Sequence, residues 1–458
     1  MTIAVLGAGP AGIGAGYRLA VGNHDVVVLE RAGQVGGTAG SFELAGTRVD
    51  YGSHRLHPST DPAILCQLRQ LLGSDLQRRF RNGRIRLLDR WIAFPLRPGD
   101  LVRRLPATFA FGAAIDAALA PTRKARRDTF AEVLQAQLGP ALCEHFYFPY
   151  ARKLWGREPQ ELSGTQARRR VSADSPTKLL RRVVQGAARS QVFWYPRRGY
   201  GQLWERLAQA TLAAGGEVQV NSAVHRVHIR DEAVEVLVSG ERSVRADMAW
   251  STLPLTVLVH LLRPLPPLEV LAAADRLSFR AMVLVYLVLD TDRYTPYDAH
   301  YFPGPDTPVT RISEPKNYRE SADDPAGLTV LCAEIPCSKD DRVWGADDAH
   351  LTHIARSALR RAELTDPHPR EVAIIRLPRA YPIYDLGYDD AFDTLDRWLS
   401  DQPRLLTFGR QGLFTHDNSH HALSMGWAAV EGLRRDGTFD AASWASARAR
   451  FEHHVVED

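Results

Sequence analysis

The beginning of the chain alternates apolar runs with a stretch of small residues. Thr2–Leu6 and residues 25–30 are short apolar runs that predict buried strands, and Pro10–Val21 between them predicts a helix. This order is a parallel β–α–β unit, because two parallel strands need a crossover connection. Such a unit is typical of the start of a nucleotide-binding domain.

The pattern changes twice along the rest of the chain. From about residue 61 to residue 189 the apolar positions follow a helical period, with Pro- and Arg-rich breaks at 95–98 and 121–127, which predicts a separate helical layer. After Gly199 the pattern predicts a meander of strands at 217–220, 223–229, 233–239 and 242–245, followed by a strand at 248–252. A helix at 254–262 and another strand at 281–290 come next. Residues 294–388 mix turns, strands and one helix (346–362), and a strand (404–408) and a helix (419–434) follow.

The two ends of the chain and the central meander predict one discontinuous domain. We place it at 1–60, 195–270 and 395–440, and we expect a second, substrate-binding domain at 61–194 and 271–394, with a C-terminal tail at 441–458. The expected fold class is α/β, with a mixed sheet and helices in the second domain.

Residues 7–12 form a GxGxxG motif between the first strand and the first helix. Gly7 permits the tight turn, Gly9 lets a pyrophosphate approach the backbone, and Gly12 lets helix and strand pack closely. The helix N-terminus offers free N–H groups to phosphate. The expected contacts with the nucleotide are Gly7, Gly9, Pro10, Ala11, Gly12, Glu30 and Arg31, with Glu30 accepting hydrogen bonds from a ribose hydroxyl.

Two segments after Glu30 carry a family resemblance. Residues 35–38 read Val-Gly-Gly-Thr, and residues 49–57 read Val-Asp-Tyr-Gly-Ser-His-Arg-Leu-His. Here the chain resembles the FAD-binding amine oxidase and protoporphyrinogen oxidase superfamily, and within it the UDP-galactopyranose mutases and bacterial protoporphyrinogen-oxidase-like proteins. Thr38 stands where relatives often have a basic residue, so a phosphate contact is in doubt there.

Three later stretches extend the resemblance to about residue 433. Residues 148–163, 194–203 and 408–429 are similar to the family's Trp-Gly element, its crossing strand and turn, and its closing flavin motif. The resemblance implies a Rossmann-type domain with non-covalent FAD. It implies cofactor contacts from Gly36, Gly37, Thr38, Gly52, Ser53, His54, Val224, Gly409, Arg410, Asn418 and Ser419.

The closing motif also has a physical basis. Asn418 or Ser419 is a good N-cap for the last predicted helix, and the N1–C2=O edge of a flavin at that terminus would meet unpaired N–H donors. Relatives usually have Met-Asp where this chain has Ser419-His420, so we expect the backbone contact to persist and leave the side-chain role open.

His54 is the catalytic candidate. The resemblance places it beside the isoalloxazine, where an imidazole can move protons. The alternative is that its ring hydrogen-bonds the backbone of its own loop. His57 is expected to be structural.

For the substrate we name Tyr381, Tyr384 and Tyr388 as a cluster that could stack on a ligand, and Arg280, Arg311 and Arg379 as anion ligands. The alternatives are a packed aromatic turn and solvated arginines.

The leading functional hypothesis is an FAD-dependent oxidoreductase that takes a hydride from a small molecule, such as a sugar nucleotide or another glycosylated metabolite. The alternative is a redox-neutral sugar-nucleotide mutase that uses reduced FAD, and a third is a non-catalytic relative, against which the intact Gly9, Glu30 and Gly37 argue. Amine oxidases of the superfamily usually carry a Lys on the strand matched to 281–290, and this strand has none.

The charge and cysteine content of the chain bear on its binding partners and its compartment. The chain has 458 residues, with 57 Lys plus Arg against 53 Asp plus Glu, so its charge of +4 gives no argument for nucleic-acid binding. Four cysteines form no zinc or disulfide spacing, which favours a cytoplasmic, reducing compartment. We expect no metal site, because His420-His421 and His453-His454 have no ligating partners at useful spacing. The oligomeric state stays open.

No stretch of the sequence predicts a membrane-spanning helix. The apolar run 107–120 is followed by Arg123, Lys124, Arg126 and Arg127, so peripheral contact with an anionic membrane is one interpretation. A helix packed in the substrate domain is the other.

Overall fold

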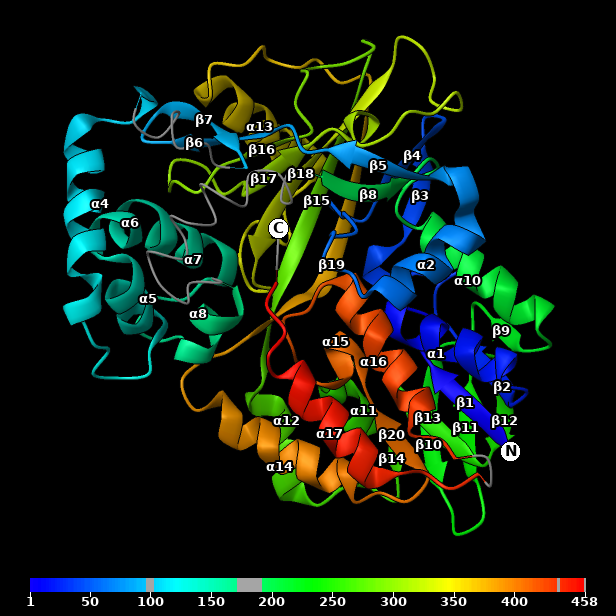
Figure 1. Cartoon of the computed structure of the whole chain (residues 1–458). Coiled ribbons are helices and arrows are strands. Elements are labelled where there is room, and N and C mark those ends of the chain that lie inside the picture. Colours follow the sequence, from blue (N-terminus) through cyan, green and yellow to red (C-terminus); the bar gives the residue numbers. More distant parts are fainter. Residues whose placement is uncertain (96–102, 171–191, 435–436, 457–458) are drawn as a thin grey trace.

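The computed structural model describes residues 1–95, 103–170, 192–434 and 437–456 (Figure 1). Two sheets organise it. The first has five parallel strands in the order β20-β13-β1-β2-β9. Its strands are β1 (Thr2–Leu6), β2 (Asp25–Leu29), β9 (Glu217–Gln219), β13 (Met248–Ser251) and β20 (Leu405–Thr407). Because all run the same way, their carboxyl ends share one edge, where open α/β sheets bind ligands.

Alternate residues of β1 pack against opposite layers. Ile3 and Val5 face a helical layer, and Ala4 and Leu6 face a meander with further helices. The helical layer contains α1 (Pro10–Val21), α2 (Pro62–Leu72), α10 (Gln202–Ala213), α16 (Ser419–Glu431) and α17 (Ala441–Phe451). The opposite layer contains β10 (Val224–Ile229), β11 (Val234–Val238), β12 (Arg242–Ala246), β14 (Leu262–Arg263), α11 (Leu255–Leu261), α12 (Leu268–Arg276) and α14 (Tyr388–Ser400).

The second sheet has seven strands in the order β19-β15-β18-β17-β16-β6-β7. They are β6 (Gly83–Leu87), β7 (Arg90–Phe94), β15 (Ser278–Leu289), β16 (Ala299–Tyr301), β17 (Arg311–Ser313), β18 (Thr329–Cys337) and β19 (Glu371–Ile383). On β15, Val283 and Val285 pack under α13 (Asp348–Arg361), whereas Leu284 and Tyr286 face the hairpin of β3 (Ser41–Leu44) and β4 (Thr47–Asp50). The pleat therefore turns one face of β15 toward the first sheet.

Another group of helices, separate from the layer on the parallel sheet, lies beside this second sheet (Figure 1). It consists of α4 (Ala107–Leu119), α5 (Phe130–Leu138), α6 (Pro140–Leu142), α7 (Phe148–Trp155) and α8 (Gly164–Arg170). Phe130, Leu134 and Trp155 form its core. Lys153 of α7 joins the layer to the sheet by donating to the carbonyl oxygens of Phe302 and Val309 at 2.6 and 3.2 Å.

The helical prediction for 61–189 is right for α2 and α4 to α8 but wrong between them. Residues 76–94 form β5 (Leu76–Phe80), β6 and β7. The alternation of arginines with apolar residues in this stretch is short. These residues become strands because they pair with distant partners: β5 with β8 (Val192–Pro196), and β6 with β16. The predicted break at 96–98 and residues 171–189 lie outside the described part of the chain. The expected α/β fold class is confirmed.

Candidate functional site

A cavity of about 630 Å³ separates the carboxyl edge of the parallel sheet from β15 and β19. Most cofactor contacts predicted from the sequence line it: Gly7, Gly9, Pro10, Ala11, Glu30, Arg31, Gly37, Thr38, Gly52, Ser53, His54, Val224, Gly409, Arg410, Asn418 and Ser419. Gly12 and Gly36 lie behind this surface. The fold thus brings residues from both ends of the chain to one cavity.

The glycine turn explains why Gly12 is hidden and Gly9 is not. A Cβ on Gly12 would lie 1.9 Å from the carbonyl oxygen of Gly7, so only glycine lets α1 pack this close to the turn. A Cβ on Gly9 would meet nothing within 4 Å, because Gly9 faces the open cavity. Gly7 has a φ of 100°, which favours glycine. The turn therefore presents bare backbone to a ligand.

A second glycine loop lies against this turn. The Gly36 amide donates to the Ala8 carbonyl oxygen at 2.8 Å, and a Cβ on Gly37 would lie 3.4 Å from Gly9 Cα. The buried carboxylate of Glu30 accepts from the amides of Ala8 and Ala32, both at 2.9 Å. Glu30 thus orders the turn and also lines the cavity, and its carboxylate can accept further hydrogen bonds.

Asp50 anchors the segment that carries His54. Its buried carboxylate accepts from Ser41 Oγ at 2.6 Å, Tyr195 Oη at 2.6 Å and the Tyr200 amide at 2.9 Å. The Tyr286 hydroxyl donates to its carbonyl oxygen at 2.6 Å. Four separate segments therefore fix where this loop enters the cavity.

The His54 ring lies on the cavity wall and is held by backbone. Its Nε2 is 2.9 Å from the Thr38 carbonyl oxygen and 3.1 Å from that of Tyr51, and the ring stacks on Tyr200. Burial lowers the pKa of His54, so the imidazole is neutral and donates from Nε2. This geometry matches the structural alternative stated for His54 and also presents the ring to a ligand.

The N-terminus of α16 opens into the same cavity. Asn418 is the N-cap and forms a capping box with His421, while Ser419 Oγ hydrogen-bonds the Tyr200 hydroxyl. A Cβ on Gly426 would lie 2.3 Å from the Ala11 carbonyl oxygen, so α16 and α1 cross in close contact. The N-termini of α1 and α16, with their positive dipole ends, thus both line this cavity.

The lining of the cavity is basic. The lining includes seven arginines, at positions 31, 55, 81, 170, 311, 379 and 410, against the three carboxylates of Glu30, Glu334 and Asp417. Arg410 donates to the Ala380 carbonyl oxygen at 2.7 Å and lies over the Tyr381 ring, and burial lowers its pKa. Within the described residues, no carboxylate forms an ion pair with Arg170, Arg379 or Arg410. Burial, helped by Arg170 and Arg410, holds the pKa of His416 well below its usual range, so this histidine is neutral.

The C-terminal segment closes part of the cavity. His454 Nδ1 lies 2.9 Å from Asp417 Oδ1, and the Val456 amide donates to the Arg169 carbonyl oxygen at 2.9 Å, which brings Val456 to the cavity wall. His421 Nδ1 lies 3.3 Å from the same Asp417 oxygen. Burial raises the pKa of Asp417, but the two histidines outweigh it and hold the pKa below its ordinary value.

The three groups Asp417, His421 and His454 are near enough to hold a metal ion, with ligand atoms within 4.8 Å of one another. The sequence spacing gave no sign of this cluster. The two imidazoles stack at 4.2 Å, and the Nδ1 atoms of both already lie 3.3 and 2.9 Å from one oxygen of Asp417. Hydrogen bonds to the shared carboxylate therefore describe the cluster better than metal ligation.

A family model described as flavin containing amine oxidoreductase matches residues 10–423. The chain belongs to this family. The protein named "Putative flavin-containing monoamine oxidase AofH" of Mycobacterium tuberculosis (strain ATCC 25618 / H37Rv) is 28% identical over 283 residues, which are 58% of this chain and 60% of that protein. The chain therefore spans less than two thirds of the length of this curated relative.

Several solved structures share the fold of this chain. A reduced UDP-galactopyranose mutase covers 100% of both chains with a TM-score of 0.79 and 18% identity. A protein titled as a putative protoporphyrinogen oxidase from Exiguobacterium sp. 255-15 covers 94% and 98% with a TM-score of 0.72 and 18% identity. A putrescine oxidase covers 98% and 100% with a TM-score of 0.66 and 18% identity. The resemblance seen in the sequence is confirmed for family and fold.

The structure brings only some of the predicted substrate residues to the cavity. Tyr381 and Arg379 line the cavity, and Arg311 lines it while held by Glu334 at 2.9 Å. Arg280 lies outside the lining and contacts Ser338 and Asp341. Tyr384 is buried and donates to the Phe414 carbonyl oxygen at 2.9 Å.

Sequence reasoning missed several residues that line the cavity. Arg170 ends α8, Met282 and Leu284 lie on β15, and Val456 belongs to the predicted tail. The one available signal was the run Arg168-Arg169-Arg170, which reads as a solvated helix end unless its tertiary neighbours are known.

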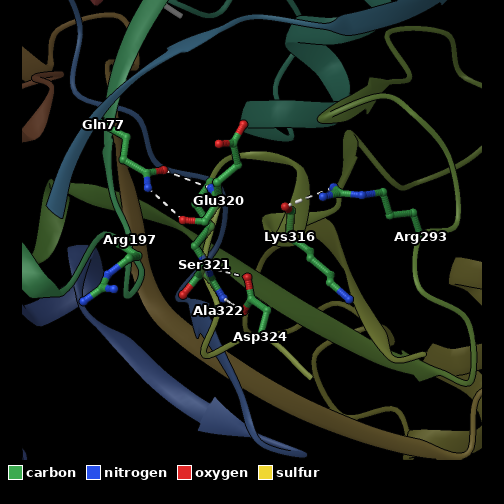
Figure 2. A pocket seen from close by; sticks show the side chains of 9 residues that line it. Gln77, Arg197, Arg293, Lys316, Glu320, Ser321, Ala322 and Asp324 are labelled. Atoms are coloured by element: carbon green, nitrogen blue, oxygen red, sulfur yellow. Dashed lines mark hydrogen bonds and ion pairs between the residues drawn. The ribbon is translucent and has the colours of Figure 1, made fainter. Parts of the chain in front are cut away.

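A second cavity, of about 570 Å³, lies at the junction of β5 with residues 316–324 (Figure 2). Its basic side chains already have partners. Lys316 pairs with Asp292 at 2.7 Å, Arg197 with Asp75 at 3.1 Å, Arg319 with Asp324, and Arg293 contacts Asn317 and the Lys316 carbonyl oxygen. Gln77 and the Glu320 backbone exchange two hydrogen bonds across it (Figure 2). This is a salt-bridged seam, so a ligand would have to displace existing contacts.

Proposed function

We propose that this flavin amine oxidoreductase is an FAD-dependent oxidoreductase that oxidises an anionic small molecule. The observation that carries the substrate class is the group of cavity arginines at positions 170, 379 and 410, which lack carboxylate partners among the described residues. FAD when bound supplies a hydride acceptor at flavin N5.

The glycine turn supports FAD as the specific flavin. Gly9 faces open space beside the N-terminus of α1, and Glu30 lies at the end of β2, which is where a dinucleotide places its pyrophosphate and ribose. The α16 N-terminus at Asn418 would face the N1–C2=O edge. No cysteine lines the cavity within the described residues, in keeping with non-covalent binding.

The charge of the cavity supports an anion over an amine. A protonated amine would enter a space whose arginines outnumber its carboxylates, and the carboxylates of Glu334 and Asp417 are already paired. An anion would gain charge-assisted hydrogen bonds from Arg170, Arg379 and Arg410. Where amine oxidases usually have their strand lysine, β15 presents Met282 and Leu284 to the cavity. A sugar nucleotide or another glycosylated anion fits this chemistry.

Each group of lining residues then has a role in binding the substrate or the flavin. The arginines bind and orient the anion, Tyr381 offers an aromatic face beside Arg410, and the apolar side chains of β15 exclude water from the reacting bond. His54 holds the loop that faces the isoalloxazine.

The test measures binding and flavin reduction on one preparation. Purified protein should release one FAD per chain on denaturation. UDP or pyrophosphate should perturb the flavin absorption spectrum, and putrescine should not. Arg410→Gln should weaken anion binding about tenfold to hundredfold, because one charge-assisted hydrogen bond contributes about 1.5–3 kcal/mol. Leu268→Gln, at an exposed position outside the lining, is the control. Rapid anaerobic reduction by amines that Arg410→Gln leaves unchanged would refute the substrate class.

A redox-neutral mutase is the second candidate, because the same arginines suit the diphosphate of a sugar nucleotide. It differs in one respect: turnover would require flavin that is already reduced and would consume no oxidant. Steady flavin reduction by the substrate without added reductant rules out this alternative.

A further inference from the structure

Helix α4 turns an apolar face outward. Its exposed positions recur every three or four residues and carry no charge: Ala107, Thr108, Phe111, Ala114, Ile115, Ala118 and Leu119. Phe111 is 70% exposed, Ile115 43% and Leu119 47%. A helix on the surface of a soluble domain normally exposes its polar face to water. α4 has the reverse arrangement, with its apolar face exposed.

The only ionisable side chain of α4 points inward. Asp116 is buried, accepts from the Ala141 amide at 2.8 Å and forms an ion pair with Arg123. Phe109 is buried on the same side. The packing of the helix therefore accounts for its inner face, and no described residue covers the apolar stripe. Figure 1 shows α4 at the outer edge of the molecule, and its buried Phe109 packs against Ile85 and Ile92 at the end of the second sheet.

Basic residues flank the stripe at both ends. Arg103 and Arg104 precede α4, and Lys124, Arg126 and Arg127 follow it, all exposed. Within the described residues, no carboxylate forms an ion pair with Lys124, Arg126 or Arg127. The stripe thus lies between two groups of positive charge.

We propose that α4 docks on an anionic membrane surface, with its apolar stripe in the interfacial region and its basic flanks among the headgroups. An apolar helix face with flanking cations is complementary to anionic lipid, which gains from both features. A second copy of the chain is a poorer partner, because a twofold contact would set the same basic groups against each other. Among the described helices, none combines the length and the apolar character needed to cross a membrane. The contact would therefore be peripheral.

The experiment is flotation of the FAD-loaded protein with vesicles. One set contains equal amounts of phosphatidylcholine and phosphatidylserine, and the other contains phosphatidylcholine alone. The parent should bind the anionic set and lose binding at high salt. Phe111→Asp should weaken binding about tenfold to hundredfold, which corresponds to withdrawing one aromatic side chain from an apolar phase. Phe80→Asp is the matched control, because Phe80 is 71% exposed but lies on β5.

A second variant tests the basic residues that follow α4. Replacing Lys124, Arg126 and Arg127 together by Gln should weaken binding about a hundredfold on anionic vesicles, since each charge near such a surface contributes about fivefold. Thermal midpoints and flavin content equal to those of the parent verify the fold, and Ile115→Asp replaces Phe111→Asp if the latter melts early.

Three results overturn the proposal. They are failure of the parent to bind anionic vesicles, binding that Phe111→Asp leaves at the parent level, and a stable dimer that Phe111→Asp converts to a monomer. The last would reassign the stripe to self-association. None of these results depends on the substrate or on the redox activity.

Discussion

Gly9→Val separates cofactor binding from folding. Gly9 has an extended backbone with φ −67° and ψ 179°, a conformation that valine adopts readily, and its Cβ would meet nothing within 4 Å. The side chain would instead enter the cavity beside the N-terminus of α1. We therefore expect the apoprotein to keep its stability within about 1 kcal/mol.

The loss should appear in FAD affinity. If the side chain prevents the pyrophosphate from reaching two backbone N–H donors, about 1.5–3 kcal/mol is lost for each charge-assisted hydrogen bond. The sum of about 3–6 kcal/mol corresponds to an increase in Kd of about 10²- to 10⁴-fold. The variant should thus purify with little flavin.

Gly12→Val provides the contrast. Its Cβ would lie 1.9 Å from the Gly7 carbonyl oxygen and 3.3 Å from a Val5 methyl group, so α1 must shift and the fold itself is destabilised. The assay is FAD titration into both apoproteins, with their thermal midpoints measured in parallel. Full FAD occupancy in Gly9→Val, or equal destabilisation of the two apoproteins, would refute the reasoning.

Three further changes test other parts of the molecule. His54→Ala should lower the free energy of unfolding by about 1–3 kcal/mol, because the Thr38 and Tyr51 carbonyl oxygens lose the donor that they share; slower flavin reduction at an unchanged melting temperature would instead show a catalytic role. Burial lowers the pKa of His300 to about 3, so the unfolded chain binds one proton more between that pH and about 6.5. Stability should fall by about 1.4 kcal/mol per pH unit as the pH drops through this window, and urea titrations of His300→Gln should show a shallower pH dependence by that amount; equal slopes contradict the assignment. His454→Ala should release the C-terminal segment and increase iodide quenching of flavin fluorescence, whereas the neighbouring His453→Ala should behave as the parent does; equal quenching in both would show that the segment does not shield the flavin.

The cofactor turn was readable from the sequence because its requirements are local. A glycine at position 7 is needed for a positive φ, and one at position 12 for the approach of α1 to the Gly7 carbonyl oxygen. The Asn418 cap is equally local, since it follows from a polar residue before an apolar helix. Such signals depend on neighbours within a few residues, which is why the family and the fold class could be predicted.

The tertiary structure decided what each polar side chain meets. Arg280 lies near the start of β15 and Arg311 begins β17, with β18 between these two strands of one sheet. Only Arg311 lines the cavity, because Arg280 hydrogen-bonds Ser338 outside it. Arg170 and Arg410 come together from positions far apart in the sequence, and both contact Tyr381. Charge, pKa and partner depend on distance in space, and residue spacing does not report that distance between separate elements. The sequence by itself therefore determined the cofactor motif. Only the packed structure decided that the lining of the cavity is basic and that the C-terminal segment forms part of this lining.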